Sequence, residues 1–103
     1  MADKPNSVEV LKHHAGDLGA AFSALRGAAA KAGPLDAKTL ELCLLSGYIV
    51  GRMEGGYKTH AKRALDLGAT PAEIIHATAF NLGANAPLEA VADALGWADE
   101  VVS

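Results

Sequence analysis

Residues 60–75 read HAKRALDLGATPAEII, and they decide the fold because one helix ends and another begins within them. Gly68 ends a segment whose apolar residues have helical spacing. Residues 70–73 form a strong helix start, in which threonine caps the helix, proline fits its first turn and glutamate completes a capping box. The stretch therefore predicts two consecutive helices, over about 57–67 and about 71–82.

Capping residues and helix-breaking residues also divide the chain before this stretch. Asn6 or Ser7 can cap a first helix, and residues 16–17 (Gly-Asp) separate it from a second, amphipathic one. The second helix stops before the Gly-Pro pair at 33–34, and Asp36 can cap a third. This third helix is nearly apolar, so we expect it to be buried over most of its surface.

Glycines and prolines also mark the remaining boundaries. Gly51 and the pair Gly55-Gly56 predict a break or a weak turn after the third helix, and Pro87 opens a last helix that runs to about Trp97. No stretch shows the alternation of apolar and polar residues that is typical of a β-strand. The sequence therefore predicts one all-α domain over residues 1–103, a small bundle of about six helices.

Composition narrows the classes of function. Half of the 103 residues are hydrophobic, many of them alanine, so the core is made of small side chains and we expect further burial in a homo-oligomer. The net charge of −3 and the lack of a basic stripe argue against a nucleic-acid partner. The apolar runs are too short for a membrane span, and residues 1–6 lack the pattern of a secretory signal. Together with the single Cys43, this predicts a reducing, cytoplasmic location.

Glu41 is the most unusual residue, because it interrupts an otherwise apolar helix. A carboxylate in an apolar setting needs a partner, and Arg52, Lys58 and His60 follow it in the sequence. If Glu41 meets His60 in a half-buried crevice, the two form a plausible proton-transfer pair. The alternative is a glutamate at a helix edge that pairs with a surface cation.

Tyr48 and Arg52 can share the helix face of Glu41, because they follow it at helical spacing. They are candidates to line a pocket for a small carboxylate substrate, with Arg52 as a bidentate clamp. The alternative is that Tyr48 packs in the core and Arg52 is a solvated charge at the helix end. Cys43 lies on the apolar helix and is interpreted as a small buried hydrophobe. The histidines match no zinc pattern, so no metal is expected.

Residues 35–42 (LDAKTLEL) and 60–75 resemble the carboxymuconolactone decarboxylase and alkylhydroperoxidase D-like family. The most recognisable tract runs from the histidine through Gly-Ala-Thr to Glu-Ile, and the similarity covers about residues 35–79. The resemblance implies a helical bundle that assembles as a homo-trimer or homo-hexamer, with pockets between subunits. It also implies that Glu41 is the proton-relay glutamate.

The peroxidase branch of this family carries a Cys-x-x-Cys motif before the histidine, and those two positions fall on Met53 and Gly56 here. Since a thiolate is required for that chemistry, thiol peroxidase activity is disfavoured. The decarboxylase branch is similar in keeping Gly-Arg and an acidic residue before the histidine, here Arg52 and Glu54, although the spacing to His60 is one residue longer.

The resemblance therefore favours a cofactor-free acid–base lyase acting on a small carboxylated lactone or a related aromatic-degradation intermediate. His60 and Glu41 are the expected catalytic residues, and Arg52, Tyr48, Lys58 and Glu54 the expected substrate-binding ones. The alternative is a non-catalytic, oligomeric binding protein of the same fold.

Overall fold

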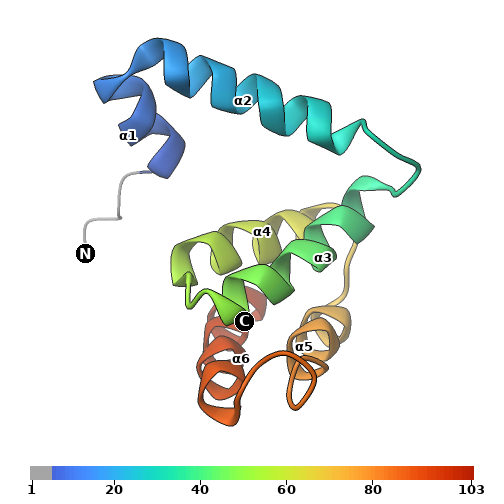
Figure 1. The fold of residues 1–103 in the computed structure, drawn as a ribbon. Helices are drawn as coiled ribbons and strands as arrows, with labels where there is room; N and C mark the ends of the chain where they lie inside the picture. The colour runs from blue at the N-terminus through green and yellow to red at the C-terminus, as the bar shows by residue number, and fades with distance from the viewer. Residues whose placement is uncertain (1–5) are drawn as a thin grey trace. The chain divides into compact units, whose positions relative to one another are not determined.

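The computed structural model of the protein describes residues 6–103, and six helices lie there (Figure 1). Residues 1–5, on which the expectation of no secretory signal rests, lie outside the described range. The all-α prediction is confirmed. The helices are α1 (Ser7–His14), α2 (Gly16–Ala30), α3 (Ala37–Val50), α4 (Glu54–Asp66), α5 (Pro71–Ala79) and α6 (Leu88–Val102).

The chain divides into two compact units, of which the first ends at Pro34 and the second runs from Leu35 to Ser103. The first holds α1 and α2, and the second holds α3 to α6. None of the described helices, in either unit, is long and apolar enough to cross a membrane. The prediction of one domain over residues 1–103 stays a prediction.

The first unit is a helical hairpin. As predicted, Asn6 caps α1: its side-chain oxygen accepts hydrogen bonds from the backbone N–H groups of Val8 (2.8 Å) and Glu9 (3.4 Å). The two helices approach closely at Gly19, because a Cβ there would collide with Lys12 of α1. Gly19 is also the only buried residue described in the hairpin.

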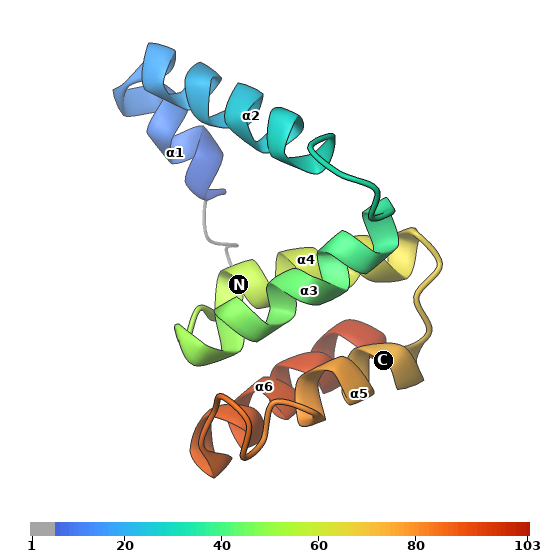
Figure 2. The same cartoon turned by 45° about the vertical axis from the view of Figure 1, so that its right-hand side comes forward.

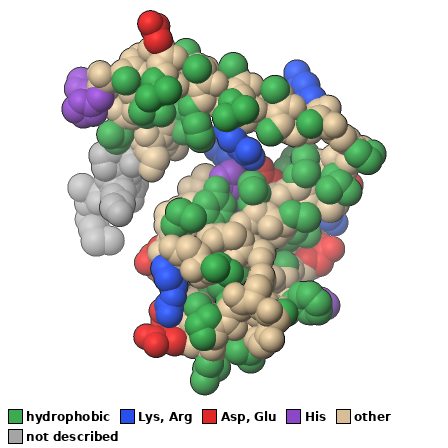
Figure 3. All heavy atoms as spheres, in the orientation of Figure 1, with side chains coloured by type: hydrophobic (Ala, Val, Ile, Leu, Met, Phe, Trp, Pro, Cys, Tyr) green, Lys and Arg blue, Asp and Glu red, His purple; other side chains and the backbone are tan. Residues whose placement is uncertain are grey.

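The hairpin leaves bulky apolar side chains of α2 exposed. Leu18 is 59% exposed, Phe22 39% and Leu25 63%, and their spacing places them along one stripe of the helix. Hydrophobic side chains are spread over the visible face of this hairpin in Figure 3. Such a stripe is typical of a surface that another chain covers.

The second unit is built in two layers, with α3 beside α4 in one layer and α5 beside α6 in the other (Figure 2). Its core is rich in alanine, which lets the helices approach closely. The buried hydrophobic residues of this core are Leu45, Ile49, Tyr57, Ala61, Ala64, Ala69, Ile74, Ala86, Ala90, Val91, Ala94 and Ala98.

Tyr57 is the largest fully buried side chain, and its hydroxyl has a partner. The hydroxyl of Thr78 donates to the carbonyl oxygen of Ile74 (2.8 Å), so it accepts the hydrogen bond from the Tyr57 hydroxyl, 2.6 Å away. Burial raises the pKa of Tyr57 above its ordinary value. This bond ties α4 to α5 through the core.

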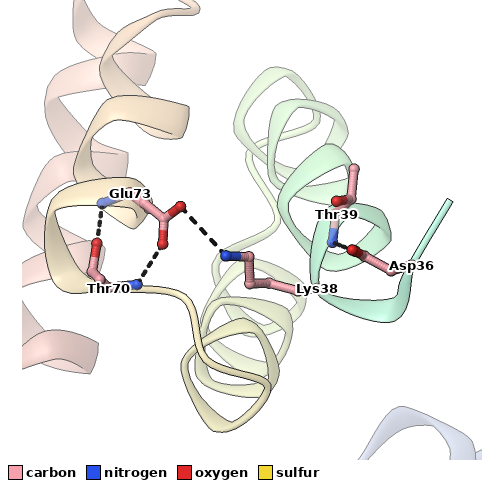
Figure 4. Close-up of polar contacts among 5 residues, drawn as sticks. All are labelled: Asp36, Lys38, Thr39, Thr70 and Glu73. Carbon is pink, nitrogen blue, oxygen red and sulfur yellow. Dashed lines mark hydrogen bonds and ion pairs between the residues drawn. The ribbon is translucent and has the colours of Figure 1, made fainter.

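The predicted helix caps of the second unit are present (Figure 4). Asp36 accepts a hydrogen bond from the backbone N–H of Thr39 (2.7 Å) at the start of α3. At the start of α5, Thr70 accepts from the backbone N–H of Glu73 (3.1 Å), and Glu73 accepts from that of Thr70 (2.8 Å). Glu73 also pairs with Lys38 of α3 (3.5 Å), so the α5 cap is linked to the first turn of α3.

Three helix boundaries differ from the predictions. The pair Gly55-Gly56 lies in the first turn of α4, since the break between α3 and α4 is confined to residues 51–53. The side-chain amide of Asn81 donates to two carbonyl oxygens at the end of α5, which therefore ends at Ala79. The last helix continues to Val102, because Val101 and Val102 still pack on the core.

The prediction that α3 is buried over most of its surface is also wrong. Leu45 and Ile49 are fully buried, whereas Val50 is 52% exposed and Cys43 is exposed. The physical reason is the two-layer arrangement of the second unit, which covers only the side of α3 that faces α4 and α5.

Candidate functional site

Glu41 and His60 meet at the seam between α3 and α4. The carboxylate oxygen Oε2 of Glu41 lies 2.5 Å from Nδ1 of His60. The side chain of His60 is 15% exposed and that of Glu41 is 18% exposed, so the pair is largely shielded but reachable. Of the two interpretations of Glu41, the structure shows the pair with histidine and not the pair with a surface cation.

This contact decides how the imidazole can act. An ionised carboxylate has only acceptor oxygens, so in this hydrogen bond Nδ1–H of His60 is the donor and Glu41 the acceptor. The bond holds the orientation of the ring and leaves Nε2 as the nitrogen that can exchange a proton with a substrate. A base oriented by a carboxylate is the arrangement that general acid–base catalysis uses.

Tyr48 completes the cluster from α3. Its ring stacks on the His60 ring, with centroids 5.2 Å apart and an interplanar angle of 16°. The predicted common face of Glu41 and Tyr48 is therefore real, and it is directed at α4. The stacked ring covers one face of the imidazole and restricts its rotation.

Gly56 allows the Tyr48 ring to lie there. A Cβ at position 56 would collide with ring atoms Cε1 and Cδ1 of Tyr48. In the resemblance described above, Gly56 occupies the position of the second cysteine of the peroxidase branch. The tyrosine ring thus takes up the space next to the backbone at that position, while Met53, at the position of the first cysteine, is 50% exposed.

Lys58 and Glu54 are not brought to this cluster. They pair with each other (2.5 Å), and Lys58 also pairs with Glu100 of α6 (3.1 Å). The hydrogen bond to Glu54, followed by that to Glu100, raises the pKa of Lys58. Because Lys58 precedes His60 by two residues, the two side chains leave α4 about 200° apart.

Arg52 is also directed towards α6. Its guanidinium nitrogen Nη1 lies 2.5 Å from Oδ2 of Asp93. Its backbone has a positive φ of 57°, unusual for a residue other than glycine. The assignment of Arg52, Glu54 and Lys58 to substrate binding stays a prediction, but within residues 6–103 none of them forms an ion pair with Glu41 or His60.

The sequence reasoning missed the acidic partners on α6. Asp93 and Glu100 are seven residues apart and therefore lie on one face of that helix, two turns from each other. The seven-residue spacing is visible in the sequence, but Glu100 lies beyond the predicted end of the last helix at about Trp97. It could have indicated that the cations at positions 52 and 58 have structural partners.

A hollow lies between α3 and residues 77–85. It has a volume of about 380 Å³, and no charged side chain lines it. Cys43 borders it, and the side-chain amide of Asn85 donates to the hydroxyl of Ser46 across it (2.8 Å). The prediction that Cys43 is buried is wrong, because the hollow between α3 and residues 77–85 leaves the thiol exposed. The residues that line the hollow are Thr39, Leu42, Cys43, Ser46, Ala77, Phe80, Asn81, Ala84 and Asn85.

A protein-family profile matches most of this chain. Neither the curated proteins nor the solved structures contain a significant match to this chain. The sequence profile described as "Carboxymuconolactone decarboxylase family" matches residues 16–100, which include α2 as well as the whole of α3 to α5. The match is longer than the resemblance over residues 35–79 and contains Glu41, Tyr48 and His60. The chain therefore belongs to the carboxymuconolactone decarboxylase family.

Proposed function

We propose that the chain is a cofactor-free acid–base lyase that removes CO2 from a small carboxylated lactone, working in the reducing cytoplasm. The observation that carries the proposal is the contact between Glu41 and Nδ1 of His60 at 2.5 Å. It combines a proton carrier with the carboxylate that orients it, in a half-buried setting. Membership of the family supports a reaction of this class but does not identify the substrate.

The proposed step is a decarboxylation followed by protonation. The bond between the reacting carbon and its carboxylate breaks, CO2 leaves, and the electron pair is delocalised onto the lactone carbonyl as an enolate. Nε2–H of the His60 imidazolium then gives its proton to the carbon. Glu41 holds Nδ1–H throughout, and solvent restores the proton on Nε2.

The test is CO2 release from γ-carboxymuconolactone. We expect His60→Ala to reduce the rate by about 10²- to 10⁴-fold, the contribution typical of a positioned acid or base, and Glu41→Gln to reduce it less. His76→Ala is the matched control, because His76 is an exposed histidine of α5 whose ring neighbour is Phe80. Turnover that survives unchanged in both site variants would rule out this mechanism and favour a binding protein of the same fold.

We also propose that the protein is a homo-oligomer, a trimer or a hexamer. The apolar stripe of α2 supports this, since Leu18, Phe22 and Leu25 remain exposed and the hairpin buries only Gly19 among its described residues. The alanine-rich core of the second unit gives each chain little burial of large side chains. A second copy would remove the stripe from water.

A further inference from the structure

We propose that the hollow between α3 and residues 77–85 is a binding site for a small uncharged aromatic compound that carries a hydroxyl group, a phenol. Neither Glu41 nor Tyr48 nor His60 lines this hollow, so the site does not depend on the proposed reaction. Its volume of about 380 Å³ lies in the range of small-molecule pockets. Since a cavity of about 150 Å³ already holds a benzene molecule, one substituted aromatic ring fits.

The walls of the hollow favour an uncharged, mainly apolar ligand. No charged side chain lines it, so an ionised ligand would lose water without gaining an ion pair. Leu42 of α3 and Phe80, which follows α5, belong to the apolar part of the lining. Phe80 is 74% exposed, and its ring neighbour His76 touches it in an edge contact with centroids 6.2 Å apart. The rest of the Phe80 ring is free to pack against an aromatic ligand.

Asn81 supplies the polar feature that points to a ligand, although it is only 5% exposed. Its side-chain nitrogen Nδ2 donates to the carbonyl oxygens of Ala77 (2.8 Å) and Thr78 (3.1 Å), whereas no residue within 6–103 donates to its oxygen Oδ1. Every fully enclosed side-chain oxygen or nitrogen in this range has a hydrogen-bond partner, so Oδ1 is open to solvent. Because Asn81 lines the hollow, Oδ1 is an acceptor that lacks a donor at its wall.

Ser46 of α3 supplies a donor on the other wall of the hollow. Its hydroxyl accepts a hydrogen bond from the side-chain amide of Asn85 (2.8 Å). A serine hydroxyl that accepts one hydrogen bond still has its own proton to donate, and no side chain within residues 6–103 accepts it. The hollow therefore offers both an acceptor and a donor. A phenol hydroxyl matches this lining, because it can donate to Oδ1 of Asn81 and also accept a hydrogen bond.

The wall that carries Asn81 is held in place before any ligand binds. The backbone carbonyl oxygen of Asn81 accepts hydrogen bonds from three N–H groups that follow it, those of Ala84 (3.1 Å), Asn85 (3.1 Å) and Ala86 (3.2 Å). The side-chain bond from Asn85 then joins this turn to α3. Because the site is preformed, a ligand loses little binding free energy in ordering the chain.

Three matched probes test the chemistry of the site. The full chain at about pH 7 is titrated with phenol, anisole and benzoate, and binding is followed at the NMR signals of the Asn81 side-chain amide, so that binding elsewhere is not counted. We expect phenol to shift these signals. Anisole, whose methylated oxygen cannot donate, should bind about 2- to 10-fold more weakly, the range of one net hydrogen bond. Ionised benzoate should bind more weakly still.

A substitution that fills the hollow tests its location. Ala84→Leu should weaken phenol binding by about 10-fold or more, because Ala84 lines the hollow and the added methylene groups take the place of the ligand. Ala79→Leu is the matched control, since Ala79 is an exposed alanine of α5 that does not line the hollow. It should bind phenol like the wild type, and equal weakening by the two variants would overturn the proposal.

Cys43 gives a second readout, because it is the only cysteine of the chain and it lines the hollow. Iodoacetamide should alkylate Cys43 in the native wild type, and phenol at ten times its dissociation constant should slow the alkylation by about 10-fold. A thiol that reacts only after denaturation would show that the hollow is covered, and would overturn the site. Anisole that binds as tightly as phenol, or phenol that changes neither the Asn81 signals nor the alkylation rate, would overturn it as well.

Discussion

Position 56 shows how one missing side chain shapes the site. The backbone of Gly56 lies against the Tyr48 ring, and that ring stacks on His60. A residue with a Cβ would force the tyrosine to move, and the imidazole would lose its cover. Glycine at this position therefore permits the aromatic contact.

Gly56→Ala should displace the Tyr48 ring and change the environment of His60. We expect the His60 ring signals to shift in NMR spectra and the free energy of unfolding to fall by about 1–3 kcal/mol, the usual cost of overpacking. Gly55→Ala is the control, since a Cβ there meets nothing within 4 Å. It should stabilise the protein by about 0.5–1 kcal/mol, because alanine favours the helix. Equal effects of the two variants would contradict the role of Tyr48.

Arg52 offers a second test at a single residue. Its positive φ of 57° follows the end of α3, where glycine is usually found. Arg52→Gly and Arg52→Ala both lose the ion pair with Asp93, but only alanine keeps a Cβ on the left-handed backbone. We expect the glycine variant to be more stable than the alanine variant by about 1 kcal/mol in urea unfolding. An alanine variant as stable as the glycine variant would show that the backbone is not strained there.

The sequence predicted which residues are candidates for the site, but not which of them are in contact. Glu41 stood out because it is a carboxylate on an apolar helix, and His60 because it lies in the family tract. Their contact, and the stacking of Tyr48, depend on how α3 packs against α4. The same packing turned Arg52 and Lys58 towards α6, which helical spacing within one segment could not reveal.

At the scale of the helices, the cap of α5 couples stability to pH. The backbone N–H of Thr70 lowers the pKa of Glu73 below its ordinary 4.5, and Lys38 contributes next (Figure 4). A lowered pKa means that the charged carboxylate stabilises the folded state above pH 4.5 and that this contribution is lost as the pH falls through the folded pKa. The stabilisation is therefore lost on the acid side.

Glu73→Gln should make the stability of the folded state depend less on pH. Glutamine can still complete the capping box, but it has no charge to lose. We expect the urea midpoint of this variant to fall less than that of the wild type between about pH 6 and about pH 3. Lys38→Gln should keep much of the wild-type slope, because the larger cause, the Thr70 N–H, remains. Identical slopes for wild type and Glu73→Gln would contradict the assignment.

Helix starts with a side-chain cap were easier to predict than helix ends. Asn6, Asp36 and Thr70 all cap as expected, since a cap is a local bond between residues close in sequence. The ends of α5 and α6 were misplaced. They depend on the side chain of Asn81 folding back on α5, and on Val101 and Val102 finding a core to pack against.

At the scale of the whole molecule, the exposed stripe of α2 makes a prediction about assembly. Sedimentation or light scattering should give a mass of three or six chains of 10.5 kDa. Leu18→Glu with Leu25→Glu should shift the protein towards monomer, because charges on an apolar interface are costly to bury. Leu88→Glu is the control, since Leu88 is more exposed (71%) than either leucine but lies at the start of α6. A monomeric wild type would refute the assembly.

The sequence by itself determined the helical class, the capped starts of α1, α3 and α5, the family and the residues around which a site could form. These depend on local spacing, on caps and on a continuous motif, all of which act over a few residues. Only the tertiary structure decided which residues meet: that Glu41 binds His60, that Tyr48 covers it over Gly56, and that α6 takes the cations at positions 52 and 58. The physical reason is that such contacts are set by the packing of layers, where a rotation of one helix by a single residue, about 100°, changes every partner.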